Sequence, residues 1–222
     1  MDGRGTGGAA RIEVLGPPQI EAAAAALVRS HADYPAFRHV FPDPATRERA
    51  LHPFFAATVR DALSFGEVLG ALDGTTVLAV AVWLPPAAFP WSVGRKLRSL
   101  PAFMRVLAAD PRSFRTFMGY GANAEHAHPE DSHWYLVVLG VRPDAQRRGL
   151  GSKLIEPVLR RADRDGVACY LETSDRANVA YYERFGFKVV DDALALVPNG
   201  PTHVAMRRSI HDEPTMPKPR RE

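Results

Sequence analysis

Two glycines near the middle of the chain stand where a strand pattern gives way to a helical pattern. Segment 133–141 is apolar and rich in β-branched and aromatic residues, which predicts a strand, and helical spacing of apolar residues resumes at Leu154. The loop between them contains Gln146, Arg147, Arg148, Gly149, Leu150, Gly151 and Ser152. No side chain suited to N-capping stands at the helix start, where backbone N–H groups lack helical partners. A phosphate site is therefore favoured over an ordinary turn.

Two residues downstream have side chains suited to proton transfer. Glu172 ends an apolar strand pattern over 167–173, where an unpartnered carboxyl would be costly to bury. It is either a general base or a structural carboxylate held by hydrogen bonds or a salt bridge. Tyr182 precedes Gly186 and Phe187, and is either a general acid or a packed core tyrosine.

Other reactive side chains lack the companions that chemistry would need. His126, His128 and His133, with Glu130 nearby, lack the helical spacing of a metal site, so we expect solvent-exposed loop histidines and no bound metal. Cys169 lies within a strand pattern without a base beside it, which favours a buried structural thiol over a nucleophile.

The loop over 146–151, preceded by Leu139-Gly140-Val141-Arg142-Pro143, resembles the acetyl-CoA signature of the GNAT acetyltransferase superfamily. The resemblance continues through 171–174, Asn178 and 182–187, and reaches upstream to 32–36 and 80–83. Over roughly residues 11–209, the chain is most similar to the puromycin N-acetyltransferase branch.

The resemblance implies that acetyl-CoA is the cosubstrate. Backbone groups of Leu139, Gly140 and Val141 would pair with the pantetheine arm, the loop over 146–152 would bind the diphosphate, and Asn178 would also contact the cofactor. A glycine inside an apolar strand independently indicates a bulge or the close approach of another backbone.

The resemblance also implies a division of catalytic roles. Tyr182 would be the general acid and Glu172 the general base. Asp33 and Tyr34 would lie near the acceptor site, where Tyr34 would either hydrogen-bond the amine, relay a proton through water in place of Glu172 as the base, or serve as a core aromatic.

Acetylation of an amine makes three chemical demands. The amine must be neutral, the oxyanion needs hydrogen-bond donors, and the departing thiolate needs a proton. An alkyl amine has a pKa of about 10.4, so its neutralisation at pH 7 costs roughly 4.6 kcal/mol. A base, or an amine with a low intrinsic pKa, lessens that cost.

The order of predicted elements indicates an α/β fold with a GNAT-like, mixed, mostly antiparallel central sheet and helices on both faces. Strands are expected near 11–15, 66–72, 76–84, 133–141, 167–173, 187–191 and 202–208, and helices near 19–30, 45–63, 150–162 and 175–184. Asp73-Gly74 predicts a hairpin turn, and Asp43 an N-cap. One domain over 11–209 is expected, with unstructured ends at 1–10 and 210–222.

The segment 85–132 is long for a connection and shows two helical patterns. One apolar stripe contains Leu97, Leu100, Met104 and Leu107, and the other Phe114, Phe117, Met118 and Gly121. These helices either only pack on the sheet or also form a wall of the acceptor pocket.

Charge and composition argue against nucleic acid and membranes as partners. Five basic and three acidic residues over 207–222 account for +2 of the net charge of +3, so the rest of the chain is nearly neutral. Nucleic acid is therefore not expected as a partner. The longest early apolar run, 22–28, is too short for a bilayer, and a single cysteine suits a reducing cytosol, so we expect a cytoplasmic protein without membrane contact.

These observations predict an acetyl-CoA-dependent N-acetyltransferase that acts by direct attack of an amine in a ternary complex. The expected acceptor is a small-molecule primary amine, such as an aminonucleoside or another antibiotic, and the protein is expected to be a monomer or homodimer. The alternatives are acetylation of a protein or peptide amine, and a non-catalytic sensor that binds acyl-CoA.

Overall fold

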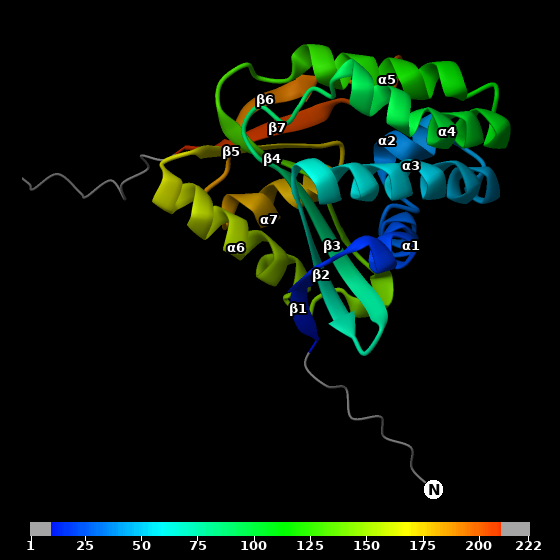
Figure 1. Cartoon of the computed structure of the whole chain (residues 1–222). Coiled ribbons are helices and arrows are strands. Elements are labelled where there is room, and N and C mark those ends of the chain that lie inside the picture. Colours follow the sequence, from blue (N-terminus) through cyan, green and yellow to red (C-terminus); the bar gives the residue numbers. More distant parts are fainter. Residues whose placement is uncertain (1–9, 210–222) are drawn as a thin grey trace, which may run out of the picture.

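The structure, a computed structural model, describes residues 10–209 (Figure 1). The ends expected to be unstructured, apart from Ala10, lie outside the described residues. Seven strands form one sheet in the order β1-β2-β3-β4-β5-β7-β6. They are β1 (Arg11–Val14), β2 (Glu67–Asp73), β3 (Thr76–Leu84), β4 (His133–Val141), β5 (Ala168–Thr173), β6 (Lys188–Leu194) and β7 (His203–Arg208). Only β4 and β5 pair in parallel, which confirms a mixed, mostly antiparallel sheet.

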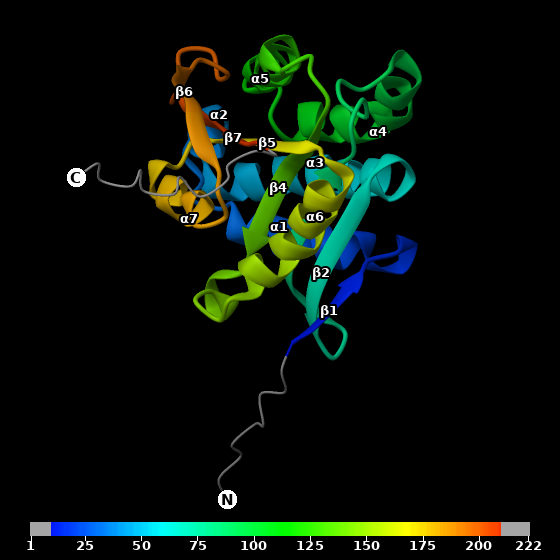
Figure 2. The ribbon, with the colours of Figure 1, turned by 90° about the vertical axis from the view of Figure 1, so that its left-hand side faces the viewer.

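Helices cover both faces of the sheet, as predicted (Figures 1 and 2). One face carries α1 (Ile20–Ser30), α2 (Pro35–Val40) and α3 (Pro44–Phe65), and the other carries α6 (Leu150–Asp165) and α7 (Val179–Glu183). Short 3-10 turns are η1 (Pro17–Gln19), η2 (Pro143–Ala145) and η3 (Arg176–Asn178). The alternation of β3 explains the two layers, because Val80 and Val82 pack toward α1 while Ala81 and Trp83 pack toward α6.

Local signals place the early elements. The Asp43 carboxylate accepts a hydrogen bond from the Thr46 N–H at 2.7 Å, so the predicted N-cap of α3 is confirmed. Pro53 lies inside α3, which continues as one helix across it. Gly74 closes the predicted β2–β3 hairpin with a φ of 58°, in the region that glycine adopts without strain.

Strands β4 and β5 pair only where they begin. Their register joins His133, Trp134 and Tyr135 to Ala168, Cys169 and Tyr170, respectively. Beyond that point β4 continues beside β3 alone, and β5 continues beside β7 alone. Among the described strands none enters this gap, so the facing backbone edges of β4 and β5 diverge without strand partners there.

Gly140 permits a close approach within β4, but by a helix. A Cβ atom at this position would lie 2.1 Å from the Ser30 Oγ of α1 and 2.9 Å from a Leu27 methyl carbon. The bulge lies three residues earlier, because Leu136 and Val138 pair with adjacent residues of β3 and leave Val137 as the extra residue. Gly140 is thus explained by packing against α1, and the bulge expected there is at Val137.

The segment 85–132 contains α4 (Val93–Ala109) and α5 (Phe114–Ala127). α4 packs on α3, where the Arg95 guanidinium binds the Asp61 carboxylate at 2.9 and 2.5 Å. α5 contacts its surroundings through Phe117, which lies edge-on to Phe54, and through Asn123, which donates to the Leu196 carbonyl at 2.9 Å. Packing on the sheet alone is therefore the wrong description of these helices.

Candidate active site

A cavity of about 1230 Å³ opens where β4 and β5 diverge. Its walls come from both faces of the sheet and from α4 and α5. Most of the residues singled out in the sequence line it, namely Asp33, Tyr34, Leu139, Gly140, Val141, Gln146, Arg147, Gly149, Leu150, Gly151, Ser152, Glu172, Asn178 and Tyr182. Arg148 does not line the cavity, because its guanidinium turns back to the Asp144 carbonyl at 3.0 Å.

The loop before α6 leaves its backbone available to an anion. Gly149 is the N-cap residue with a φ of 72°, and Arg147 also has a positive φ of 62°. No side chain caps the first turn of α6, and its first three residues, Leu150, Gly151 and Ser152, line the cavity with N–H groups that lack partners inside the helix. Oriented N–H groups and the helix dipole favour a bound phosphate here.

The two glycines of this loop serve different purposes. A Cβ atom on Gly149 would meet no other atom within 4 Å, so that side of the loop is open. A Cβ atom on Gly151 would lie 2.6 Å from the Tyr181 hydroxyl. Gly149 therefore satisfies the left-handed turn, while Gly151 makes room for a tyrosine of α7 against the first turn of α6.

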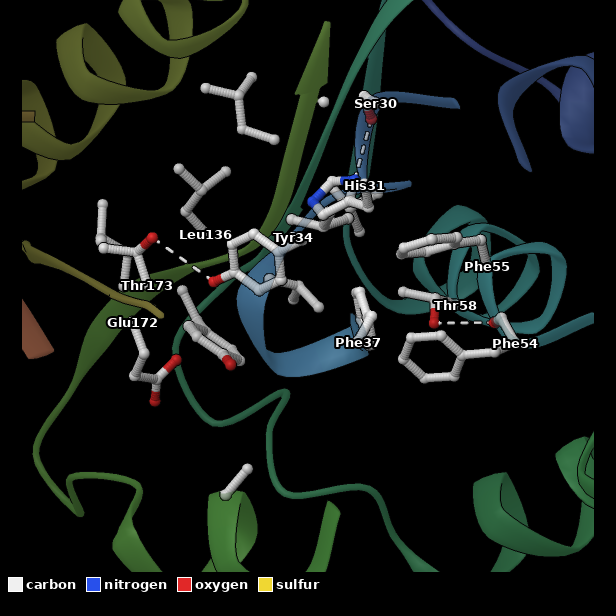
Figure 3. A pocket seen from close by; sticks show the side chains of 18 of the residues that line it. Ser30, His31, Tyr34, Phe37, Phe54, Phe55, Thr58, Leu136, Glu172 and Thr173 are labelled. Carbon is white, nitrogen blue, oxygen red and sulfur yellow. Dashed lines mark hydrogen bonds between the residues drawn. The ribbon is translucent and has the colours of Figure 1, made fainter. Parts of the chain in front are cut away.

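Glu172 projects into the cavity from β5, as Figure 3 shows. Burial raises the pKa of its carboxyl to about 7, although hydrogen bonding with the Tyr135 and Tyr170 phenols favours the charged form and limits the rise. The pair is assembled by sheet register, because Tyr135 of β4 is directly opposite Tyr170 of β5. Glu172 is thus a carboxyl that changes charge near neutral pH inside the cavity.

Tyr34 connects α1 and α2 to the end of β5. Its hydroxyl accepts a hydrogen bond from the Ser174 N–H at 2.7 Å and donates to the Thr173 Oγ1 at 3.4 Å, the latter drawn in Figure 3. Asn178 donates to the same Thr173 oxygen at 3.4 Å. These contacts favour a positioning role for Tyr34, whereas Asp33 is exposed at the cavity rim.

Tyr182 has a buried ring and a hydroxyl without a hydrogen-bond partner among residues 10–209. The residue is 8% exposed and packs edge-on against Phe187, with ring centroids 6.0 Å apart. Burial raises the pKa of its phenol above the ordinary value, and the nearby Tyr34 phenol acts in the same direction. The hydroxyl is therefore protonated at neutral pH and available to a group in the cavity.

Several residues of the site were not recognised in the sequence. Tyr135 and Tyr170 belong to segments that the sequence marks only as apolar strands, although Tyr170 shares a face of β5 with Glu172 through the two-residue period. His31 lines the cavity beside Tyr34, and burial lowers the pKa of its imidazole to about 4. Tyr120 also lines it, with its hydroxyl 3.0 Å from the His203 Nε2. Nothing in the local sequence marks His31 or Tyr120.

The prediction of exposed loop histidines is wrong for two of the three. His133 is buried, His128 is half-buried, and their Nε2 atoms lie 3.0 Å apart. His126 is exposed, as expected, but it lies in the last turn of α5 and not in a loop. Cys169 is fully buried, and burial raises the pKa of its thiol to about 12, which agrees with an inert thiol. Residues 10–209 contain no group of three or more His, Cys, Asp or Glu side chains able to hold a metal ion.

The cavity has the features that coenzyme A requires. The open side of Gly149 and the uncapped N–H groups of α6 suit a diphosphate, and the unpaired edge of β4 suits the amide groups of a pantetheine arm.

No helix within residues 10–209 has both the length and the apolar character needed to cross a membrane.

Comparison with known proteins agrees with this geometry. The profile of the Acetyltransferase (GNAT) family matches residues 31–187. An uncharacterised N-acetyltransferase of Schizosaccharomyces pombe is 45% identical over 58 residues, which cover 26% of this chain and 24% of that protein. The match to this curated relative thus spans about a quarter of its length.

Many solved structures share the fold, and two of them illustrate the likeness. One, described as histone acetyltransferase HPA2 and related acetyltransferase from Corynebacterium glutamicum, has a TM-score of 0.65 at 21% identity, with 95% of this chain and 99% of that one covered. The PaiA N-acetyltransferase from Thermoplasma acidophilum, in complex with coenzyme A, has a TM-score of 0.55 at 13% identity, with 90% and 98% covered. Since the family profile spans most of the sequence, the chain belongs to the GNAT family of acetyltransferases, whose members generally use acetyl-CoA.

Proposed function

We propose that this protein transfers the acetyl group of acetyl-CoA to a primary amine of a small molecule, by direct attack in a ternary complex. The observation that carries the proposal is the placement of Glu172. Its carboxyl lies in the same cavity as the anion-binding loop, and burial raises its pKa to about 7. A base whose pKa is near the working pH is effective in proton transfer.

Acetyl-CoA, when bound, supplies a thioester carbonyl open to attack and a thiolate as the leaving group. The loop at 146–152 and the first turn of α6 hold its diphosphate, while the backbone of Leu139, Gly140 and Val141 aligns its pantetheine arm. A backbone N–H of β4 near Val141 stabilises negative charge on the carbonyl oxygen. Arg147 adds positive charge beside the loop, whereas Arg148 is turned away.

Glu172 and Tyr182 handle the protons. Glu172 removes a proton from the amine, directly or through water, so that the nitrogen can form the new C–N bond. The Tyr182 hydroxyl gives a proton to sulfur as the C–S bond breaks. Its raised pKa keeps the proton in place until negative charge develops on the sulfur. Tyr34 positions the end of β5 that carries Glu172.

The finer parts of the proposal concern the acceptor. Walls formed by α4 and α5 around a cavity of about 1230 Å³ support a small molecule over a protein or peptide amine. The resemblance of the sequence motifs to the puromycin N-acetyltransferase branch is the support for proposing an aminonucleoside or a related antibiotic as the acceptor. We further propose a cytoplasmic enzyme, a monomer or homodimer, without nucleic-acid or membrane partners.

Substitution of Gly149 tests the anion site. Gly149→Ala should weaken coenzyme A binding at least about fivefold in calorimetry, because it strains the left-handed turn and places a methyl group on the open side of the loop. Gly166→Ala is a matched control at the other end of α6, since Gly166 has a φ of 62° and equally open surroundings. Equal affinities of the two variants for coenzyme A would contradict this location.

The pH dependence of turnover tests Glu172. The carboxylate is the active form, so kcat/KM should rise with pH through about 7. Glu172→Gln should remove this rise and lower kcat by roughly 10²- to 10⁴-fold. Unchanged turnover in the variant would exclude Glu172 as the base.

Stability provides an independent readout of the same group. Because the folded pKa is raised, the folded state holds the Glu172 proton more tightly than the unfolded state, and stability falls as pH rises from about 4.5 to 7. Denaturant titrations at pH 5 and pH 8 give the change in the free energy of unfolding between these two pH values. On going from pH 5 to pH 8, this free energy should fall by about 1 to 3 kcal/mol less in Glu172→Gln than in the unmodified protein.

A comparison of adjacent phenols tests the acid. Tyr182→Phe should lower kcat about 100-fold without weakening coenzyme A binding, because only the proton for sulfur is lost. Tyr181→Phe should retain most of the turnover, since its hydroxyl packs against Gly151. A larger effect of Tyr181→Phe on kcat would reverse the assignment.

An amine panel tests the alternative of a non-catalytic sensor. If coenzyme A binds normally but no amine in a broad panel is acetylated, the protein is a sensor.

A further inference from the structure

Helix α4 leaves three large apolar side chains of its predicted stripe exposed. Its buried positions are Arg95, Ser99, Ala102 and Val106. Leu97, Leu100 and Met104, three members of the predicted apolar stripe, are 64%, 50% and 52% exposed. A helix that served only to cover a core would show the opposite arrangement. The exposed stripe therefore needs a different explanation.

Part of this stripe faces the cavity. Leu97 and Leu100 line it, and so does Met118 of α5, which is 43% exposed, whereas Met104 does not. The same part of the cavity is lined by aromatic rings of α2 to α5, three of them being Phe37, Phe54 and Phe117. Figure 3 shows Phe37 and Phe54 beyond Tyr34, on the side away from Glu172. The acceptor end of the cavity is thus apolar and rich in aromatic rings.

Acidic groups at this end already have partners. Asp61 is held by Arg95 in a two-point ion pair with both side chains at most 7% exposed. Glu125 binds the Lys96 ammonium at 2.6 Å. Among the other lining carboxylates of the described chain, Asp33 is at the exposed rim and Asp175 caps η3, which leaves Glu172 inside. The cavity can therefore neutralise one ammonium group deeply, but not a second.

We infer that the acceptor is a monoamine whose amino group is carried on a bulky apolar body of aromatic size. This inference rests on the proposed function and specifies its substrate class. The amine binds at Glu172, and the body fills the space between the phenylalanines of α2, α3 and α5 and the cavity-facing residues Leu97, Leu100 and Met118. Contact with an apolar ligand accounts for their exposure in the free protein. A second ammonium would lose its water there without gaining a partner.

Three amines that share a butyl chain distinguish an acceptor with an apolar body from one with a hydroxyl or a second amino group. Phenylbutylamine should give the highest kcat/KM, aminobutanol a value at least about tenfold lower, and diaminobutane the lowest, since only the first buries an apolar body. The double variant Leu97→Ser/Leu100→Ser should raise KM for phenylbutylamine about tenfold and change KM for aminobutanol less than about twofold. Both leucines are exposed, so the variant should fold normally.

Met104→Ser is the matched control, because Met104 lies on the same stripe with similar exposure but outside the cavity. It should leave KM for every amine unchanged. Equal kcat/KM values for diaminobutane and phenylbutylamine would overturn the inference, as would a double variant that affects all amines equally. Conversion of a dimer to a monomer by the double variant, without a change in KM, would identify the stripe as a self-association surface and would also overturn it.

Failure of the proposed function gives a different result. If none of the amines is acetylated although coenzyme A binds, calorimetric titration of phenylbutylamine into the coenzyme A complex still tests the apolar site. Binding that is weakened about tenfold by Leu97→Ser/Leu100→Ser, and not by Met104→Ser, would support the inference without catalysis. No detectable binding of phenylbutylamine would refute it.

Discussion

The divergence of β4 and β5 is the constraint on which the site depends. The two strands pair over three residues and then separate, so their backbone edges become available to a ligand without a cost in lost sheet hydrogen bonds. The same divergence brings the uncapped N-terminus of α6 and the end of β5 to one cavity. An anion-binding turn, an unpaired strand edge and a half-buried carboxyl thus result from one feature of sheet topology.

The surroundings of Glu172 show how packing sets chemistry. Burial alone would keep the carboxyl protonated, whereas the Tyr135 and Tyr170 phenols favour its charged form, and the balance places its pKa at about 7. The hydrogen bonds of Tyr34 hold the end of β5 in place. On the acceptor side, the buried pair of Arg95 and Asp61 fixes α4 on α3 and removes a competing negative charge. The contacts that hold β5 and α4 in place therefore also determine the charge that an acceptor meets in the cavity.

Features determined by local interactions could be predicted from the sequence. The Asp43 cap, the Asp73-Gly74 hairpin and the loop before α6 each depend on a few neighbouring residues. Features determined by register or by tertiary packing could not. Tyr135 meets Tyr170 only through the β4–β5 register, and the orientation of the α4 stripe depends on the ion pair with α3. The burial of His128 and His133 likewise follows from contacts that the sequence alone does not reveal.

Residue-resolved amide hydrogen exchange, with and without saturating coenzyme A, tests most directly whether the divergent strands bind the cosubstrate. We expect coenzyme A to slow exchange at least about tenfold at amides of β4 within 139–141 and at 150–152 in the first turn of α6, with little change in β6. Calorimetrically confirmed binding without protection of either segment would contradict the account, because the ligand would then occupy another surface.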